Sequence, residues 1–323
     1  MPPSYPPTSL EHVRELRPLT GHDGLSGAEL YRGVLIDGTP VIAKRSVADG
    51  DVFQRLLGHR TSLELALWRE GVLDRLPDGV SSPTIGGWTE LDASWIVMRD
   101  LGDTIIGPDH PFDDVEVDRL LDRLDRLHFS GLRPAATTSL AAAIAMFSPP
   151  RVAEFGTVDL ATAVEGGWAA FRDLAPAGVA DSVVALACDP APLVAALEAR
   201  PIGFCHGDIA GVNLAWQGDN LTLLDWGQAV LAPPAFDIAR FLPSGLRSSI
   251  LTNDDLLNRY RAVTGTRFDE IALELSLLAA FVWYGWQKAL DIVEARDPVR
   301  RTVEAEALAW WVDRLPRAVS LLM

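Results

Sequence analysis

The sequence predicts an α+β protein with a small β-rich N-terminal lobe and a larger, mainly helical C-terminal lobe. Alternating apolar residues at Leu30–Leu35 and Val41–Ala43 flank Asp37-Gly38, a pair typical of a β-hairpin turn. After residue 100, apolar residues recur mostly at helical spacing. We therefore expect a β-rich lobe at residues 1–100 and a mainly helical lobe at residues 101–323.

The composition is that of an ordinary globular protein of 323 residues, with 48% hydrophobic and 22% charged residues. Its formal charge of −16 argues against binding to nucleic acid or an anionic membrane, and suits a cationic ligand. Many proteins are this acidic for solubility alone. The two cysteines form no disulfide framework, and the longest apolar run, Leu275–Trp286, is too short to span a bilayer. We expect a soluble cytoplasmic protein.

A glycine-rich bend precedes the first hairpin strand and contains Gly24, Ser26 and Gly27. Backbone amides in such a bend can face a phosphate, although a bend of this kind is more often only a turn. Lys44 ends the second strand, and an ammonium under a glycine bend can reach the phosphates of a nucleotide. A lone lysine at a strand end would more often be solvated.

A long helical pattern follows at Val52–Leu76. Glu64 lies within it and is our candidate partner for Lys44, with Glu70 as the alternative. Strand-like runs around Trp88 and at Ser94–Met98 then complete the β-rich lobe.

The most informative stretch runs from Phe204 to Gly227 and contains Asp208, Asn213 and Asp225. Two short apolar runs surround the turn cluster Gln-Gly-Asp-Asn, which predicts a hairpin between Asn213 and Asp225. A hairpin brings its ends together, so two carboxylates and an amide oxygen should converge, as suits Mg²⁺. A further carboxylate beside the metal can accept a proton from a hydroxyl, which is the layout of phosphoryl transfer.

The order of these features resembles the aminoglycoside phosphotransferase and choline kinase group of small-molecule kinases, which share a two-lobed protein-kinase-like fold. The resemblance covers about residues 20–265, with specific catalytic motifs and a looser remainder. It implies that Asp208 is the catalytic base and that Asn213 and Asp225 bind Mg²⁺. It also implies that Lys44 holds the ATP phosphates and that Glu64 positions Lys44.

The same resemblance implies several supporting roles. The backbone from Met98 to Leu101 would bind the adenine edge, while His206 and Asp237 would brace the catalytic loop. The loop covering the phosphates would contain Gly24, Ser26 and Gly27.

Three features depart from the pattern of the group. Ala210 stands where many relatives have His and protein kinases have Lys, which disfavours a protein substrate. Gly227 stands where many small-molecule kinases have an acidic residue, and the glycine bend is shorter than a full G-x-G-x-x-G loop.

Acceptor recognition in this group comes from the helical lobe, and our candidate face is Trp283, Trp286, Gln287 and Asp291. Aromatic and acidic groups together suit a hydroxylated, amine-bearing molecule. Tryptophans in closing helices more often belong to the core.

The resemblance thus implies ATP- and Mg²⁺-dependent transfer of phosphate to a hydroxyl of a small molecule: an aminoglycoside-like or other antibiotic, or an amino sugar. The alternatives are a housekeeping kinase for choline, a sugar or homoserine, and a degenerate kinase fold that regulates by binding nucleotide. The sequence leaves open the acceptor, the choice between ATP and GTP, and the oligomeric state.

Overall fold

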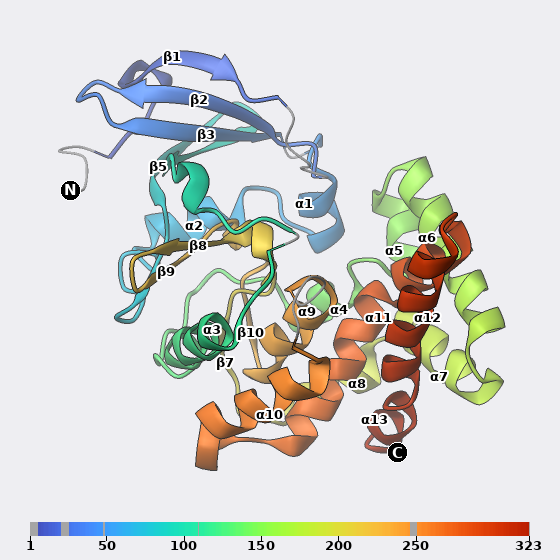
Figure 1. The fold of residues 1–323 in the computed structure, drawn as a ribbon. Helices are drawn as coiled ribbons and strands as arrows, with labels where there is room; N and C mark the ends of the chain where they lie inside the picture. Colours follow the sequence, from blue (N-terminus) through green and yellow to red (C-terminus); the bar gives the residue numbers. More distant parts are fainter. Residues whose placement is uncertain (1–5, 21–25, 48, 109, 246–250, 323) are drawn as a thin grey trace.

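The computed structural model describes residues 6–20, 26–47, 49–108, 110–245 and 251–322. Figure 1 shows an antiparallel sheet at one end of the molecule and a large group of helices at the other. The predicted α+β class with a β-rich N-terminal part and a helical C-terminal part is therefore confirmed.

The large sheet has the strand order β1-β2-β3-β6-β5, and every neighbouring pair is antiparallel. Its strands are β1 (Val13–Pro18), β2 (Glu29–Leu35), β3 (Pro40–Val47), β5 (Thr84–Glu90) and β6 (Ala93–Arg99). The expected turn at Asp37-Gly38 joins β2 to β3, and Gly38 has the positive φ of 86° that such turns require. Strand β3 lies at the centre of the sheet, which fixes Lys44 in position.

The predicted helix at Val52–Leu76 is divided in two, as α1 (Val52–Leu57) and α2 (Leu63–Arg69). Helix α1 ends at Gly58, which has a left-handed φ of 78°, and the Ser62 side chain caps the start of α2. Both are ordinary end signals of helices, and the continuous leucine periodicity across them hid the break.

Two smaller sheets lie below the large one. In the first, β4 (Val80–Ser81) pairs in parallel with β9 (Asn220–Leu223), which pairs with β8 (Leu214–Gln217) as the predicted hairpin. In the second, β7 (Gly203–Cys205) pairs with β10 (Val230–Ala232).

The remaining α-helices form the helical part around a long helix, α11 (Glu270–Glu294), which is mostly buried and packs against α6, α9 and α12, while α3 and α10 pack against each other. They are α3 (Asp114–His128), α4 (Leu140–Ala145), α5 (Pro149–Phe155), α6 (Val158–Leu174), α7 (Ala177–Cys188), α8 (Ala191–Glu198), α9 (Ala235–Gly245), α10 (Asn253–Thr264), α12 (Pro298–Val312) and α13 (Leu315–Ser320). Short 3-10 turns lie at Leu10–His12, Gly102–Thr104, Gly211–Asn213, Trp226–Gln228 and Gly265–Arg267.

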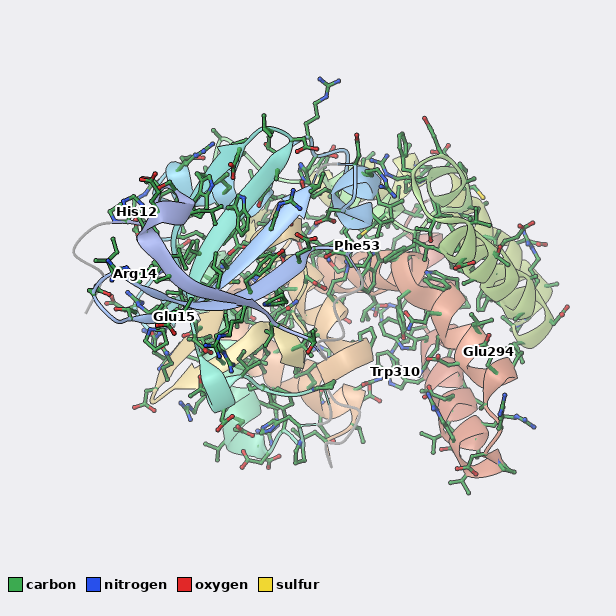
Figure 2. The ribbon with its side chains drawn as sticks, turned by 90° about the horizontal axis from the view of Figure 1, so that it is seen from above. His12, Arg14, Glu15, Phe53, Glu294 and Trp310 are labelled. Carbon is green, nitrogen blue, oxygen red and sulfur yellow. The ribbon has the colours of Figure 1, made fainter. Side chains whose placement is uncertain are left out.

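One large hydrophobic core fills the helical part, and a smaller core lies against the sheet. Leu56 of α1 and Leu67 of α2 belong to the large core, so these two helices join the sheet to the helical part. Figure 2, seen from above, shows Arg14 of β1 and Glu294 of α11 on opposite sides of the molecule. The division at residue 100 remains a prediction.

Among the described residues, no single helix is long and apolar enough to cross a membrane. The bent pair α7 and α8 passes such a test by length and composition only.

Candidate active site

The loop after β7 carries Asp208 and turns sharply at Gly207. Gly207 has a φ of 82°, and a Cβ at this position would lie 2.2 Å from the carbonyl oxygen of Gln228. A residue other than glycine would therefore clash as well as strain the backbone. The glycine lets the chain reverse directly before Asp208, whose side chain is half-buried at the floor of a cleft.

The β8–β9 hairpin brings Asn213 and Asp225 together, because its open end lies between them. The Leu224 amide donates a 2.9 Å hydrogen bond to Asn213 O. Asn213 Nδ2 donates to Asp208 Oδ2 at 3.0 Å, which joins the amide to the first carboxylate. Asp225 adopts a left-handed φ of 57°, a strained conformation for a non-glycine residue and one that occurs often at functional sites.

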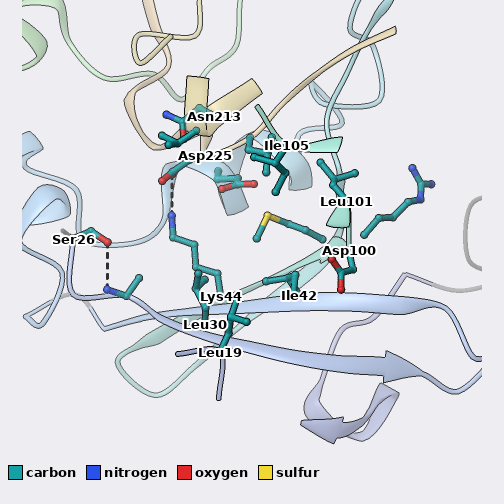
Figure 3. A pocket seen from close by; sticks show the side chains of 16 residues that line it. Leu19, Ser26, Leu30, Ile42, Lys44, Asp100, Leu101, Ile105, Asn213 and Asp225 are labelled. Carbon is teal, nitrogen blue, oxygen red and sulfur yellow. Dashed lines mark hydrogen bonds and ion pairs between the residues drawn. The ribbon is translucent and has the colours of Figure 1, made fainter. Parts of the chain in front are cut away.

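Lys44 extends from β3 across the cleft to this hairpin. Its Nζ donates a 2.9 Å hydrogen bond to Asp225 Oδ1, as Figure 3 shows. Burial lowers the pKa of Lys44, but the charges of Asp225 and Glu64 outweigh that effect and raise the pKa above its ordinary value. Burial likewise raises the pKa of Asp225, but the Lys44 ammonium outweighs it and holds that pKa below its ordinary value.

Glu64, the expected partner of Lys44, lines the same cleft but forms no ion pair with it within 4.0 Å. Its carboxylate accepts a 2.5 Å hydrogen bond from Thr84 Oγ1, and its side chain is buried. Burial raises the pKa of Glu64. The alternative, Glu70, is exposed and accepts a hydrogen bond from the Ala135 amide at 3.0 Å.

A cavity of about 420 Å³ opens beside Lys44 and Asp225. The segment from Met98 to Leu101, which is the expected adenine-binding edge, lines this cavity. Its apolar walls come from both parts of the molecule, as Figure 3 shows for several of them: Leu19, Ala28, Leu30, Ile42, Ile105 and Val212. A flat apolar slot that ends at a lysine suits a base with attached phosphates.

The described part of the glycine bend lies at the rim of this cavity. Ser26 lines it, and Ser26 Oγ accepts a 3.3 Å hydrogen bond from the Ala28 amide. Gly27 has a φ of 85°, and a Cβ there would lie 2.7 Å from the carbonyl oxygen of Gly50. Gly24 lies outside the described residues.

Two further cavities continue from the first. A narrow one of about 110 Å³ is lined by Lys44, Glu64, Asp208 and Asp225. The next, of about 380 Å³, shares Asp208 with the narrow cavity and extends to helix α11. The three spaces together form a path from the apolar slot, past the charged groups, to α11.

The structure separates the four candidate acceptor residues. Trp283, Gln287 and Asp291 line the third cavity beside Asp208. Trp286 does not line it, because its side chain is buried on another face of α11 and its ring packs 5.7 Å from that of Phe147. Its Nε1 donates to Trp283 O at 3.1 Å, so Trp286 is a core residue.

His206 and Asp237 lie behind the catalytic loop and hold its backbone. Asp237 is completely buried and accepts hydrogen bonds from the amides of His206 at 2.9 Å and Gly207 at 2.7 Å. It also accepts one from His128 Nε2 at 2.9 Å. His206 Nε2 donates to Leu224 O at 2.8 Å, which ties the loop to the hairpin.

His128, Cys205 and Asp237 place possible metal ligands within 4.8 Å of one another. Both Asp237 oxygens already accept hydrogen bonds, so we interpret this group as structural. Burial raises the pKa of Asp237, but the hydrogen bond from His128 outweighs it and holds that pKa below its ordinary value.

Arg240 of α9 was not among the site residues predicted from the sequence. It is buried, lines the third cavity, and donates a 2.8 Å hydrogen bond to Ala143 O. Its guanidinium lies 4.0 Å from the centre of the Trp283 ring. Burial lowers the pKa of Arg240 to about 9. Arg240 follows Asp237 by three residues, so it points from the same helix face toward the catalytic loop, a spacing that was visible in the sequence.

Several solved structures that the chain resembles are those of small-molecule kinases. The chain is similar to choline kinase from Streptococcus pneumoniae, with a TM-score of 0.57, 12% identity, and coverage of 94% of this chain and 95% of that one. It is also similar to an aminoglycoside phosphotransferase from Streptomyces rimosus, with a TM-score of 0.54, 18% identity, and coverage of 83% and 93%. A second structure of the latter, in complex with ADP and streptomycin, has a TM-score of 0.52, 17% identity, and coverage of 81% and 94%. At these identities the similarity establishes the fold.

No curated protein matches the chain in a sequence comparison. A family model described as the phosphotransferase enzyme family matches residues 79–271, which is more than half of the chain and includes Asp208, Asn213 and Asp225. The chain belongs to this phosphotransferase enzyme family.

Proposed function

We propose that the protein transfers the γ-phosphate of ATP to a hydroxyl group of a small molecule, with Mg²⁺ as cofactor. The observation that carries this proposal is the convergence of Lys44, Asp208, Asn213 and Asp225 where an apolar slot meets a second cavity. Phosphoryl transfer needs charge neutralisation and in-line positioning of its two substrates, and this arrangement supplies groups for both.

The first cavity is the proposed ATP site. The base would lie between the apolar walls, against the backbone from Met98 to Leu101, and the phosphates would extend toward Lys44. The structural relative from Streptomyces rimosus that was solved with ADP supports nucleotide binding in this fold. We propose ATP as the donor, with GTP as the alternative.

Asn213 and Asp225 are the proposed Mg²⁺ ligands. Because Asn213 Nδ2 already binds Asp208, its Oδ1 is the atom left for a cation among the contacts of the described residues. Carboxylate and amide oxygens are the ligands that Mg²⁺ prefers, so the donor set fits this ion. When bound, Mg²⁺ would neutralise charge on the phosphates.

Asp208 is the proposed base for the acceptor hydroxyl. Burial raises the pKa of its carboxyl, and the nearby charge of Asp225 acts in the same direction. Asn213 fixes the carboxylate by its 3.0 Å hydrogen bond, and Asp237 fixes the preceding backbone. Asp208 lines both the narrow cavity and the third cavity. A carboxylate fixed at this place can orient a hydroxyl for attack.

The proposed acceptor enters the third cavity. Hydroxylated antibiotics and amino sugars are the first candidates, and choline, sugars and homoserine are the housekeeping alternatives. The relative solved with streptomycin supports small-molecule binding in this fold. Lys44, Asp208, Asn213 and Asp225 all line the first cavity or the narrow cavity next to it. This convergence favours an enzyme over a regulator that only binds nucleotide. Because ATP is the donor, we propose that the protein acts in the cytoplasm.

The decisive experiment combines ATP, Mg²⁺ and a panel of hydroxylated compounds, and detects an added phosphate on the acceptor by mass spectrometry. Asp208→Asn should reduce kcat by about 10²- to 10⁴-fold while the KM for ATP changes little. Asp219→Asn is the matched control, because Asp219 is an exposed residue of the hairpin turn. Near-wild-type turnover by Asp208→Asn would refute the role of Asp208, and ATP binding without any phosphate transfer would favour the regulatory alternative.

A further inference from the structure

The size and the lining of the third cavity indicate which acceptor would fit, which neither the family nor the motifs do. The cavity has a volume of about 380 Å³, which is within the usual range for one small ligand. Because the third cavity shares Asp208 with the narrow cavity, a molecule bound in the third cavity would have its hydroxyl next to the proposed base. The side chains around the rest of the cavity therefore select the body of the acceptor.

Most of the wall is apolar or aromatic. Trp283 of α11 lies against the guanidinium of Arg240 on one side of the cavity. The other apolar and aromatic lining residues are Pro108, Ile209, Val212, Pro243 and Tyr284. Such a wall stabilises a molecule with an apolar face, since both surfaces lose contact with water on binding.

The charges around the cavity are balanced, although the whole chain has a formal charge of −16. Among the described residues, two carboxylates line it, Asp208 and Asp291, together with two cations, Arg240 and Lys288. Lys288 Nζ forms an ion pair with Glu304, so its charge is compensated from the neighbouring helix. Equal numbers of acidic and basic side chains therefore line the cavity itself.

Arg240 places a guanidinium at the cavity wall, and the charges of Asp208 and Asp237 act on it from beyond ion-pair distance. Its hydrogen bonds go to the carbonyl oxygens of Ala143 and Gly207 and to the side-chain amide oxygen of Gln228. It has no carboxylate within 4.0 Å among the described residues. A buried guanidinium repels an ammonium strongly because little water separates the two charges.

We infer that the acceptor is a hydroxylated ring compound with an apolar face and at most one positive charge, bound against Trp283. This inference rests on the proposed function. It narrows the hydroxylated, amine-bearing acceptor expected from the sequence, because Arg240 and Lys288 were not part of that expectation. A polycation would bring several ammonium groups to a wall that has as many cations as carboxylates. One of these carboxylates, that of Asp208, is needed to bind the acceptor hydroxyl.

The test compares two sets of acceptors under the same ATP and Mg²⁺ concentrations. The polycationic set is streptomycin and spectinomycin, and the uncharged set is a nucleoside and a hydroxylated macrolactone. We expect phosphate transfer to a member of the uncharged set with a kcat/KM at least about tenfold above that of either polycation. Faster transfer to a polycation, or no transfer to the uncharged set, would overturn the inference.

The same assay separates this inference from the proposed function. Asp208-dependent ATP turnover, with water or any compound as acceptor, tests the proposed function alone. If turnover depends on Asp208 but polycations are preferred, the inference is wrong and the proposed function stands. If no ATP turnover occurs with any acceptor, the proposed function itself fails.

A charge variant provides a second test, which changes the charge of the cavity wall and keeps the acceptors the same. Gln287→Glu adds a carboxylate at an exposed position of the cavity wall, on a helix that tolerates glutamate. It should raise the ratio of kcat/KM for spectinomycin to kcat/KM for the uncharged acceptors about tenfold. Val293→Glu places the same charge on an exposed position of α11 that does not line the cavity, and should leave the ratio unchanged. No change with Gln287→Glu would show that the charge of this wall does not select the acceptor.

Discussion

Lys44 Nζ lies 2.9 Å from Asp225 Oδ1, so the central strand of the large sheet is joined directly to the mouth of the β8–β9 hairpin. The two residues are 181 positions apart in the sequence. The Lys44 side chain is 17% exposed and that of Asp225 is 46% exposed, so solvent partly screens the pair. In this structure the lysine binds the proposed metal ligand. Binding of ATP and Mg²⁺ would therefore place new partners around both groups.

Replacing Lys44 tests this contact. Lys44→Met should lower kcat/KM for ATP by about 10²-fold, because the positive charge that would face the ATP phosphates is lost. The free energy of unfolding should change by less than about 1 kcal/mol, since partly exposed ion pairs contribute little. Steady-state kinetics and urea unfolding measure the two effects. Arg45→Met is the matched control, because Arg45 belongs to the same strand but pairs with the exposed Glu29. An unchanged KM and kcat in Lys44→Met would rule out the nucleotide role.

The sequence was sufficient to predict the β8–β9 hairpin, because its strand pairing depends on neighbouring residues. The turn cluster at 217–220 fixes the register of β8 and β9, and that register brings Asn213 and Asp225 together. The Asp37-Gly38 hairpin and the position of Lys44 on its second strand follow from the same local rules.

The contacts between distant segments could not be predicted in the same way. The sequence offered Glu64 as the partner of Lys44, but the structure joins Lys44 to Asp225 and Glu64 to Thr84, a choice made by distances across the fold. Trp283 and Trp286 have the same chemistry, and only the packing of α11 decides which one faces the cavity.

Glu64 and Glu70 can be distinguished by a paired substitution. Glu64→Gln should lower kcat/KM for ATP by about tenfold, because it removes a buried charge that helps to keep Lys44 protonated and positioned. Glu70→Gln should have little effect on kinetics, since Glu70 is exposed and bonds to the Ala135 amide. The comparison is made with ATP as the varied substrate at saturating Mg²⁺. Equal losses in the two variants, or a loss only in Glu70→Gln, would contradict the assignment.

The acidic side of the pH profile should report Asp208. Its pKa is raised above the ordinary 3.8 by burial, and the proposed base acts only when unprotonated. The value of kcat/KM should therefore fall tenfold per pH unit below the raised pKa and level off above it. Asp225, whose pKa is lowered, stays ionised through this range, and Lys44, whose pKa is raised, stays protonated. Rates measured from about pH 3 to pH 9, with circular dichroism to confirm folding, provide the test. A midpoint below 3.8 would show that Asp208 does not set this limb.

Asp237 should be the most sensitive polar residue for stability. Asp237→Asn leaves two backbone amides and His128 without the carboxylate that they share, which should cost about 3–5 kcal/mol in urea unfolding. Asp92→Asn, at an exposed turn, should change the free energy of unfolding by less than about 0.5 kcal/mol.

The pH dependence of this loss identifies its electrostatic origin. The pKa of Asp237 is lower in the folded protein than in the unfolded chain, so its stabilisation is fully present above the unfolded pKa. That stabilisation is lost as the pH falls through the folded pKa. The difference between wild type and Asp237→Asn should therefore be constant above about pH 5 and decrease only below about pH 4. A difference that is the same at every pH would mean that the lost hydrogen-bond acceptor, and not the charge of Asp237, holds the loop before Asp208 in place.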